Sequence, residues 1–164
     1  EDRWRKSAAV LLDAPYDLSR QVIPFMKLRR GGRIINIASI CAFREGGWNF
    51  SYGVMKGGLV AMTRCMANAV GKYQINVNAI APGMTKTGLT DDFNASICGD
   101  AEKGQAILEK LFLAPWNGRW ASAEEMGYPM AAVGSHLFSY MSGQILYIDY
   151  GTASTWEMDE LTKS

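Results

Sequence analysis

The chain has 164 residues, of which 48% are hydrophobic and 20% are charged, and its formal net charge is +1 at pH 7. These values are typical of one globular domain, and they exclude the long basic or acidic tails that bind nucleic acids. No apolar run reaches the roughly 20 residues needed to cross a bilayer, and residues 1–6 do not resemble a signal peptide. The three cysteines match no zinc or redox spacing, so we expect reduced thiols and a cytoplasmic protein with neither membrane nor nucleic-acid partners.

The first predicted element is a helix over residues 4–26. Its apolar residues recur at spacings of three and four: Ala8, Leu11, Leu12, Leu18, Val22 and Met26. Pro15 interrupts this pattern, and we expect either a kink there or a break with Asp13 capping a second helical segment.

The next element is a strand over residues 33–39 that ends at Ser39. Ligands of open α/β sheets bind outside the carboxyl ends of the strands, so the Ser39 hydroxyl is a candidate donor to a substrate oxygen. Arg29, Arg30 and Arg33 lie ahead of this strand, and we interpret them as part of a solvated loop.

Residues 51–72 give the clearest helical pattern, with a core-facing stripe formed by Met55, Leu59, Met62, Met66 and Val70. Tyr52 and Lys56 are four residues apart and therefore share one face of this helix. An ammonium close to a phenol stabilises the phenolate and lowers its pKa toward neutrality. Tyr52 is therefore a candidate acid and base, with Lys56 tuning it.

The remaining chain predicts two more strands, at 75–80 and 144–149, separated by an irregular stretch and a helix. The first of these strands ends at Pro82 and Gly83. Residues 84–120 contain four glycines and one short amphipathic piece around residues 107–112. Ser122 and Glu125 form a capping box, which predicts a helix from there to about Phe138. No metal site is expected, because the aspartates of this stretch are irregularly spaced.

Four blocks carry a family resemblance: residues 32–39 (GRIINIAS), 52–56 (YGVMK), 78–83 (NAIAPG) with Thr87, and 142–149 (SGQILYID). In order and spacing they resemble the second half of a classical short-chain dehydrogenase/reductase. The resemblance implies an α/β fold, namely the carboxyl-terminal half of a doubly wound Rossmann-type parallel sheet. It further implies that residues 1–164 form a single partial domain, with a substrate-lid segment at about 84–120.

The same resemblance implies the chemistry, a hydride transfer between NAD or NADP and a small-molecule carbonyl or secondary alcohol. Tyr52 would transfer the proton, Ser39 would orient the substrate oxygen, and Lys56 would lower the tyrosine pKa and bind the nicotinamide ribose. Pro82, Gly83 and Thr87 would contact the nicotinamide carboxamide, although Pro82 and Gly83 also fit an ordinary turn. The helix at 51–72 would pair with its copy in a homo-oligomer, a dimer or tetramer.

Two departures from the family pattern leave an alternative open. The sequence contains no glycine-rich phosphate loop, so we interpret it as a carboxyl-terminal fragment or an incomplete record. Leu11 occupies the position of a catalytic asparagine that helps to hold a proton-relay water. The alternative is therefore a non-catalytic fragment or scaffold subunit of the same ancestry.

Overall fold

The computed structural model describes residues 2–44, 50–108 and 118–154. In chain order the helices and strands are α1 (Asp2–Ala8), the π-helical turn η1 (Ala9–Asp13), α2 (Ala14–Leu28), β1 (Gly32–Ile37), η2 (Ile40–Ala42), α3 (Phe50–Val70), η3 (Gly71–Tyr73), β2 (Ile75–Pro82), α4 (Gly88–Cys98), α5 (Ala101–Leu108), α6 (Ala123–Gly134), η5 (His136–Phe138), β3 (Ile145–Ile148) and η6 (Thr152–Ser154). The short turns η2, η3, η5 and η6 are 3-10 helices.

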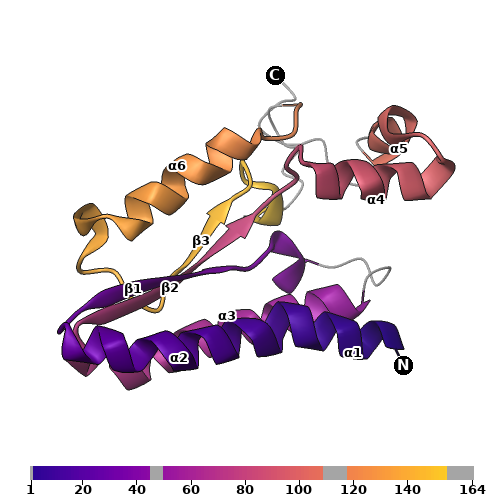
Figure 1. Ribbon diagram of the computed structural model, residues 1–164. Coiled ribbons are helices and arrows are strands. Elements are labelled where there is room, and N and C mark those ends of the chain that lie inside the picture. The colour runs from indigo at the N-terminus through magenta and orange to yellow at the C-terminus, as the bar shows by residue number, and fades with distance from the viewer. Residues whose placement is uncertain (1, 45–49, 109–117, 155–164) are drawn as a thin grey trace.

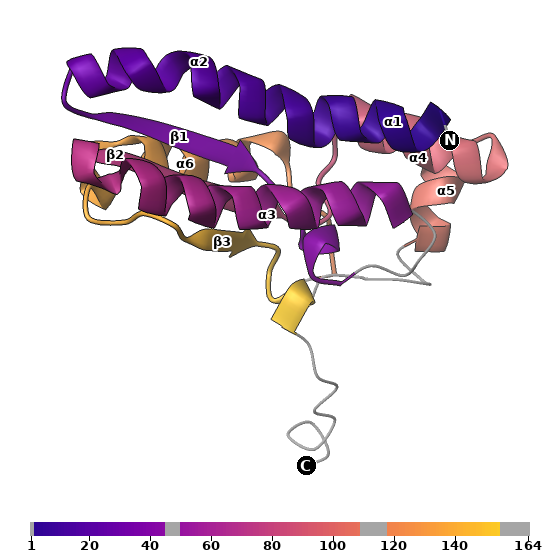
Figure 2. The same cartoon turned by 90° about the horizontal axis from the view of Figure 1, so that it is seen from below.

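The three strands form a parallel sheet in the order β1-β2-β3. Helices α2 and α3 cover one face of the sheet and α6 covers the other, so the chain folds into three layers (Figures 1 and 2). Parallel strands joined through helices are the arrangement of a Rossmann-type fold. The sequence prediction of a partial doubly wound α/β sheet is therefore confirmed.

The core lies around β2, the central strand. Val77, Ala79, Ile80 and Ala81 are each 0% exposed, because helices cover both faces of this strand. On α3, Met55, Leu59 and Val70 of the predicted apolar stripe are buried at 5% exposure or less. This packing fixes the rotation of α3 about its own axis, and therefore which residues of its first turns face the sheet.

Of the two outcomes expected at Pro15, the break capped by Asp13 is wrong. Neither a break nor a cap at Asp13 occurs, since Asp13 has helical φ and ψ of −67° and −46° and its side chain makes no capping hydrogen bond. Instead the chain widens into the π-helical turn η1, in which the Ala14 N–H donates to Ala9 O. Pro15 follows directly and lacks an N–H, so the wider turn lets the helix continue through a residue that cannot join the regular hydrogen-bond ladder.

The region 84–120 was predicted to be irregular, and this is wrong for residues 88–108, which form the helical hairpin α4–α5. Gly99 ends α4 with a left-handed φ of 79°. A Cβ at Gly104 would lie only 1.9 Å from the carbonyl oxygen of Asn94, so glycine is required where the two helices meet. Gly99 thus caps a helix and Gly104 allows a close helix contact, so neither glycine prevents helix formation. Residues 109–117, within which part of the amphipathic piece falls, lie outside the described residues.

Helix α6 begins with the predicted capping box, in which the Ser122 hydroxyl accepts from the Glu125 N–H and the Glu125 carboxylate accepts from the Ser122 N–H. It ends at Gly134, earlier than the predicted Phe138, and His136 lies exposed in the following turn η5.

Within the described ranges, no helix combines the length and the apolar character that a membrane span requires.

Candidate active site

Ser39 lies two residues beyond the end of β1, at the carboxyl edge of the sheet. Its backbone is extended, with φ −167° and ψ 157°, and its side chain is 8% exposed. Just before it, Ala38 N–H donates to Ile80 O over 2.7 Å and keeps the chain beside β2. The Ser39 Oγ accepts the N–H of Cys41 at 3.1 Å. This bond occupies a lone pair and leaves the hydroxyl proton for an acceptor in the site.

Tyr52 and Lys56 lie on the first turns of α3, on the face predicted from their spacing. The Lys56 Nζ stands 5.6 Å from the centroid of the Tyr52 ring. The same Nζ donates a hydrogen bond of 2.5 Å to Ile37 O, the last residue of β1. Lys56 therefore bridges the tyrosine on α3 and the strand end from which Ser39 follows, and the structure brings all three predicted residues to one edge of the sheet.

Burial sets the electrostatics of Lys56, whose side chain is only 8% exposed. Desolvation lowers the pKa of Lys56 below its ordinary value, and the electrostatic influence of Cys41 opposes this effect more weakly. A buried ammonium is stabilised by a neighbouring anion or by electron-rich groups, such as a carbonyl oxygen or an aromatic ring. A phenolate at Tyr52 would supply such an anion.

Leu11 lies in the π-helical turn η1 and faces the same cavity as Lys56. This cavity has a volume of about 470 Å³ and runs between the first helices and β1, with Ile37 and Leu59 also in its wall. The position where the family resemblance expects an asparagine is therefore on the cavity that Lys56 faces. Leucine presents only carbon atoms there, so it cannot hold a water by a side-chain hydrogen bond.

Pro82 and Gly83 stand where β2 ends, as predicted, and Gly83 N–H donates to Ile148 O over 2.9 Å. A Cβ at Gly83 would lie 2.9 Å from both the Cα and the Cβ of Asp149. Contacts that short do not occur between real side chains, so glycine is required for β2 and the end of β3 to approach each other. The structure thus supplies a packing reason for Gly83 that holds whether or not a ligand binds beside it.

Thr87 is the N-cap of α4. Its Oγ1 accepts from the Thr90 N–H at 3.4 Å, and its own N–H donates to Thr90 Oγ1 at 2.9 Å. The sequence analysis missed this reciprocal cap because the fourth residue is threonine rather than the usual glutamate or glutamine. Thr87 is exposed five residues beyond the end of β2, and its hydroxyl is engaged in starting the helix.

A contact that the sequence did not reveal ties the loop after Ser39 to the end of the described chain. Arg44 Nη1 donates to Thr152 O at 2.8 Å, across 108 residues of sequence. The turn that receives it is built on Asp149, whose carboxylate accepts the N–H groups of Gly151 and Ala153. No local pattern could have predicted the pair, since the two segments meet only through the sheet.

Comparison with known proteins identifies the family. Residues 1–153 match the protein family described as Enoyl-(Acyl carrier protein) reductase. The chain is 34% identical over 140 residues to 3-oxoacyl-(acyl-carrier-protein) reductase FabG of Rickettsia prowazekii (strain Madrid E), an alignment that covers 85% of this chain and 54% of that protein. The chain belongs to the classical short-chain dehydrogenase/reductase family.

Other short-chain dehydrogenases/reductases resemble it to a similar degree. Over 127 residues it is 35% identical to 2-dehydro-3-deoxy-D-gluconate 5-dehydrogenase of Escherichia coli (strain K12), covering 77% of this chain and 47% of that protein. The structure superposes with a TM-score of 0.84 on L-sorbose reductase from Gluconobacter frateurii, at 28% identity over 95% of this chain and 60% of the other. The chain spans about half the length of the curated relatives it matches, 54% of the first and 47% of the second.

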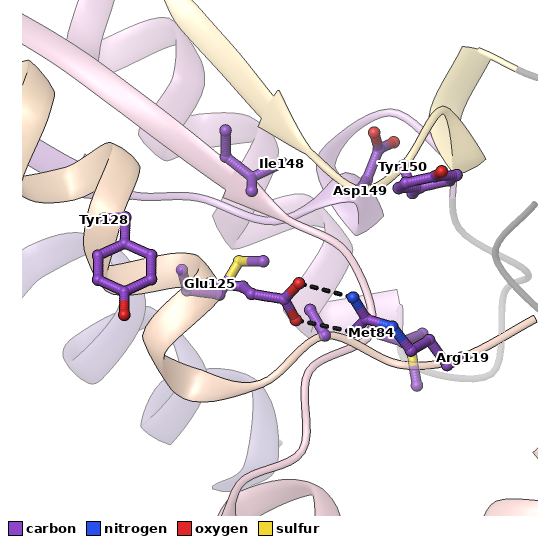
Figure 3. A pocket seen from close by; sticks show the side chains of 9 residues that line it. Met84, Arg119, Glu125, Tyr128, Ile148, Asp149 and Tyr150 are labelled. Carbon is purple, nitrogen blue, oxygen red and sulfur yellow. Dashed lines mark hydrogen bonds and ion pairs between the residues drawn. The ribbon is translucent and has the colours of Figure 1, made fainter. Parts of the chain in front are cut away.

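A separate hollow of about 270 Å³ lies on the α6 side, lined by residues that include Met84, Arg119, Glu125, Asp149 and Tyr150. In this short-chain dehydrogenase/reductase, Arg119 and Glu125 form two hydrogen bonds of 2.7 Å each (Figure 3). The hydrogen bonds from Arg119 lower the pKa of Glu125 to about 2, and the Ser122 N–H contributes further. The two charges neutralise each other, and the hollow includes none of Ser39, Tyr52 and Lys56.

Proposed function

We propose that this chain provides the catalytic residues of an NAD(P)-dependent oxidoreductase that interconverts a carbonyl group and a secondary alcohol by hydride transfer. One observation carries the proposal. The Lys56 ammonium lies 5.6 Å from the Tyr52 ring centroid while it is hydrogen-bonded to Ile37 O, beside the strand end that leads to Ser39. The printed names of the relatives support it, since they are reductases and dehydrogenases.

In the reducing direction, Tyr52 gives its phenolic proton to the substrate oxygen as the carbonyl carbon gains a hydride. Lys56 stabilises the phenolate that remains, because the two charges lie close together in a desolvated site. Ser39 keeps its proton and donates a hydrogen bond from its hydroxyl to the same oxygen, which holds that oxygen in place while negative charge develops on it. In the oxidising direction the Tyr52 phenolate takes the alcohol proton, and Ser39 and Lys56 keep the same roles.

The residues present fit a nicotinamide nucleotide, NAD or NADP. Lys56 has three N–H donors, of which Ile37 O takes one, and it lines a cavity of about 470 Å³ where sugar hydroxyls could accept the others. When bound, the reduced nicotinamide would supply the hydride. Thr87, Pro82 and Gly83 are proposed to border the ring at the carboxyl edge of β2. In support, L-sorbose reductase was solved in complex with NADPH and L-sorbose.

The substrate is proposed to be a small molecule that binds under residues 84–120. Helices α4 and α5 lie beyond the carboxyl ends of the strands, away from the three layers (Figure 1). Gly104 packs α5 closely on the backbone of α4, so the hairpin can act as one unit. These features suit a substrate lid within a single partial domain that comprises residues 1–164.

A homo-oligomer, a dimer or tetramer, is proposed to form through α3. Of its small residues, Gly58 is explained within the chain, because a Cβ there would lie 3.2 Å from the Leu12 side chain. Ala61, Cys65 and Ala69 are exposed on the described chain and leave room for a helix of a second copy. Light scattering coupled to size-exclusion chromatography tests this, and Ala61→Glu should convert an oligomer to the monomer. A wild-type chain that is monomeric at every concentration would rule it out.

One observation favours the alternative, a non-catalytic fragment or scaffold subunit: Leu11 puts only carbon atoms on the cavity that Lys56 lines. Titration of the chain with NADH and NADPH, followed by nucleotide fluorescence, separates the two functions. Saturable binding supports the oxidoreductase. Binding of neither nucleotide supports the scaffold.

Tyr52→Phe is the direct test of the proposed chemistry. Removing one hydroxyl should reduce turnover by about 10²-fold or more, because the proton donor is lost, while the circular dichroism spectrum stays unchanged. Tyr16→Phe is the matched control, since Tyr16 is 49% exposed and lies on α2. Full activity in Tyr52→Phe would refute the assignment of the acid and base.

A further inference from the structure

Ser39 lies at the start of a short turn that has little stability of its own. The turn η2 has three residues and is closed by three backbone hydrogen bonds, the last from Arg44 N–H to Ile40 O at 2.9 Å. Such short 3-10 turns have poor hydrogen-bond geometry. The Ser39 side chain belongs to the turn, because its Oγ accepts the Cys41 N–H at 3.1 Å. The direction of the serine hydroxyl therefore depends on what holds this loop.

Two contacts tie the loop to the end of the described chain. The centroid of the Phe43 ring lies 4.8 Å from that of the Tyr147 ring on β3. The next residue, Arg44, donates from its Nη1 to Thr152 O at 2.8 Å. Because the contacts come from consecutive residues and reach β3 and η6, they fix both the position and the direction of the loop relative to the sheet.

The turn that accepts the guanidinium hydrogen bond is itself firmly held. Thr152 is only 3% exposed, and its Oγ1 donates to Asp149 O at 2.6 Å. The Asp149 carboxylate accepts the N–H groups of Gly151 and Ala153 at 3.0 and 2.6 Å. Asp149 also stands against Gly83, where a Cβ would come within 2.9 Å of it. The loop after β1 is therefore anchored to a fixed point at the carboxyl edge of the sheet.

Of the two contacts, the hydrogen bond from Arg44 constrains the loop more strongly. Phe43 and Tyr147 are 43% and 41% exposed, and a pair of aromatic rings tolerates sliding. A hydrogen bond fixes both a distance and a direction, and a charged donor makes it stronger than a neutral one. Loss of the Arg44 side chain should therefore free the loop even if the rings stay in contact.

We propose that Arg44 is a positioning residue, whose hydrogen bond to Thr152 O holds the loop so that the Ser39 hydroxyl faces the substrate oxygen. The proposal rests on the proposed function, because Arg44 acts through Ser39. A hydrogen-bond donor must lie close to the oxygen on which negative charge develops, so a small displacement of the loop removes much of its effect. Arg44 itself contacts neither the substrate nor the cofactor and moves no proton.

The first test uses the full chain and needs no substrate. Hydrogen exchange of the Cys41 N–H, followed by NMR, reports the position of the Ser39 side chain, because that N–H bonds to Ser39 Oγ. Arg44→Gln should speed this exchange by about tenfold or more. In a Ser39→Ala background the same substitution should change it by less than about twofold, since the reporting bond is already absent. Arg44→Lys keeps a charged donor and should have a smaller effect than Arg44→Gln.

The second test measures turnover with NADPH and L-sorbose, the compounds bound in the solved L-sorbose reductase. Arg44→Gln should lower kcat by about tenfold or more and leave the KM for NADPH within about twofold, because Ser39 acts on the substrate oxygen. The loss should disappear in a Ser39→Ala background. The control Arg20→Gln removes the same charge from an exposed site on α2 and should change neither readout. Urea unfolding shows that each variant is folded.

Unchanged Cys41 exchange in Arg44→Gln would overturn the proposal, as would a loss of kcat that is equally large with and without the Ser39 hydroxyl. Faster exchange confined to the N–H groups of Gly151 and Ala153 would also overturn it, since Arg44 would then support only the last turn. If the wild type shows no turnover, the proposed function fails for this substrate, and the Cys41 exchange still supports or overturns the placement of Ser39 by Arg44.

Discussion

Lys56→Met tests the physical basis of the proposed mechanism, because methionine nearly preserves the volume of lysine and removes its charge. The ammonium lies 5.6 Å from the centre of the Tyr52 ring. If this distance is taken as the approximate separation of the ammonium from the phenolate charge, the pair gains about 3 kcal/mol at an effective dielectric constant of about 20. That energy corresponds to about two pH units in the ionisation of the phenol. The variant should therefore need a pH about two units higher to ionise Tyr52.

Two measurements follow the shift. In alcohol oxidation, the rising limb of the pH–rate profile should move up by about two units, and the rate at neutral pH should fall by about 100-fold. In the chain itself, ultraviolet difference absorbance reports phenolate formation. The Tyr52 signal is isolated by subtracting the same titration of a Tyr52→Phe background, since the chain has seven tyrosines.

The control for this experiment is Lys86→Met, which removes a charge from an exposed position. Lys56→Met also deprives Ile37 O of its hydrogen bond, a loss that the removal of a buried charge offsets. Urea unfolding therefore accompanies the titration, to show that both variants are folded. A folded Lys56→Met chain whose Tyr52 ionises at the same pH as in the wild type would refute the argument that Lys56 tunes the phenol.

Three further outcomes are expected. The pKa of Glu125 is lowered from 4.5 to about 2, so the ionised carboxylate stabilises the fold above pH 4.5 and this contribution is lost as the pH falls toward 2. In the variant Arg119→Gln, an NMR titration should show the pKa of Glu125 returning toward 4.5. Tyr150 is exposed and has a left-handed φ of 53°. Because glycine adopts this φ without strain, Tyr150→Gly should raise the free energy of unfolding, measured in urea, by about 1 kcal/mol. A lower free energy of unfolding in the variant would contradict the strain argument. Gly104→Ala should destabilise the α4–α5 hairpin by about 2 kcal/mol or more, which would be measured as faster hydrogen exchange in α4. The control is Gly71→Ala, whose Cβ would meet nothing within 4 Å and which should leave that exchange unchanged.

Local patterns in the sequence were sufficient for the strands and for α3. A run of β-branched residues predicts β1 because such side chains fit a pleated sheet, and the stripe from Met55 to Val70 predicts α3 because helical side chains repeat every 3.6 residues. The spacing of Tyr52 and Lys56 predicted their shared face for the same reason. Sequence patterns did not predict the hairpin α4–α5, because the effect of a glycine on a helix depends on which atoms lie against it.

The sequence by itself determined which residue types stand at the ends of the strands and on the first turns of α3, because periodicity and strand order are properties of the chain. Only the tertiary structure decided what surrounds them. The burial of Lys56, its bond to Ile37 O and the placement of Leu11 on its cavity arise from packing between segments far apart in sequence. The contact of the Lys27 ammonium with the Tyr73 ring has the same origin, since α2 and the turn η3 after α3 meet only in the folded chain.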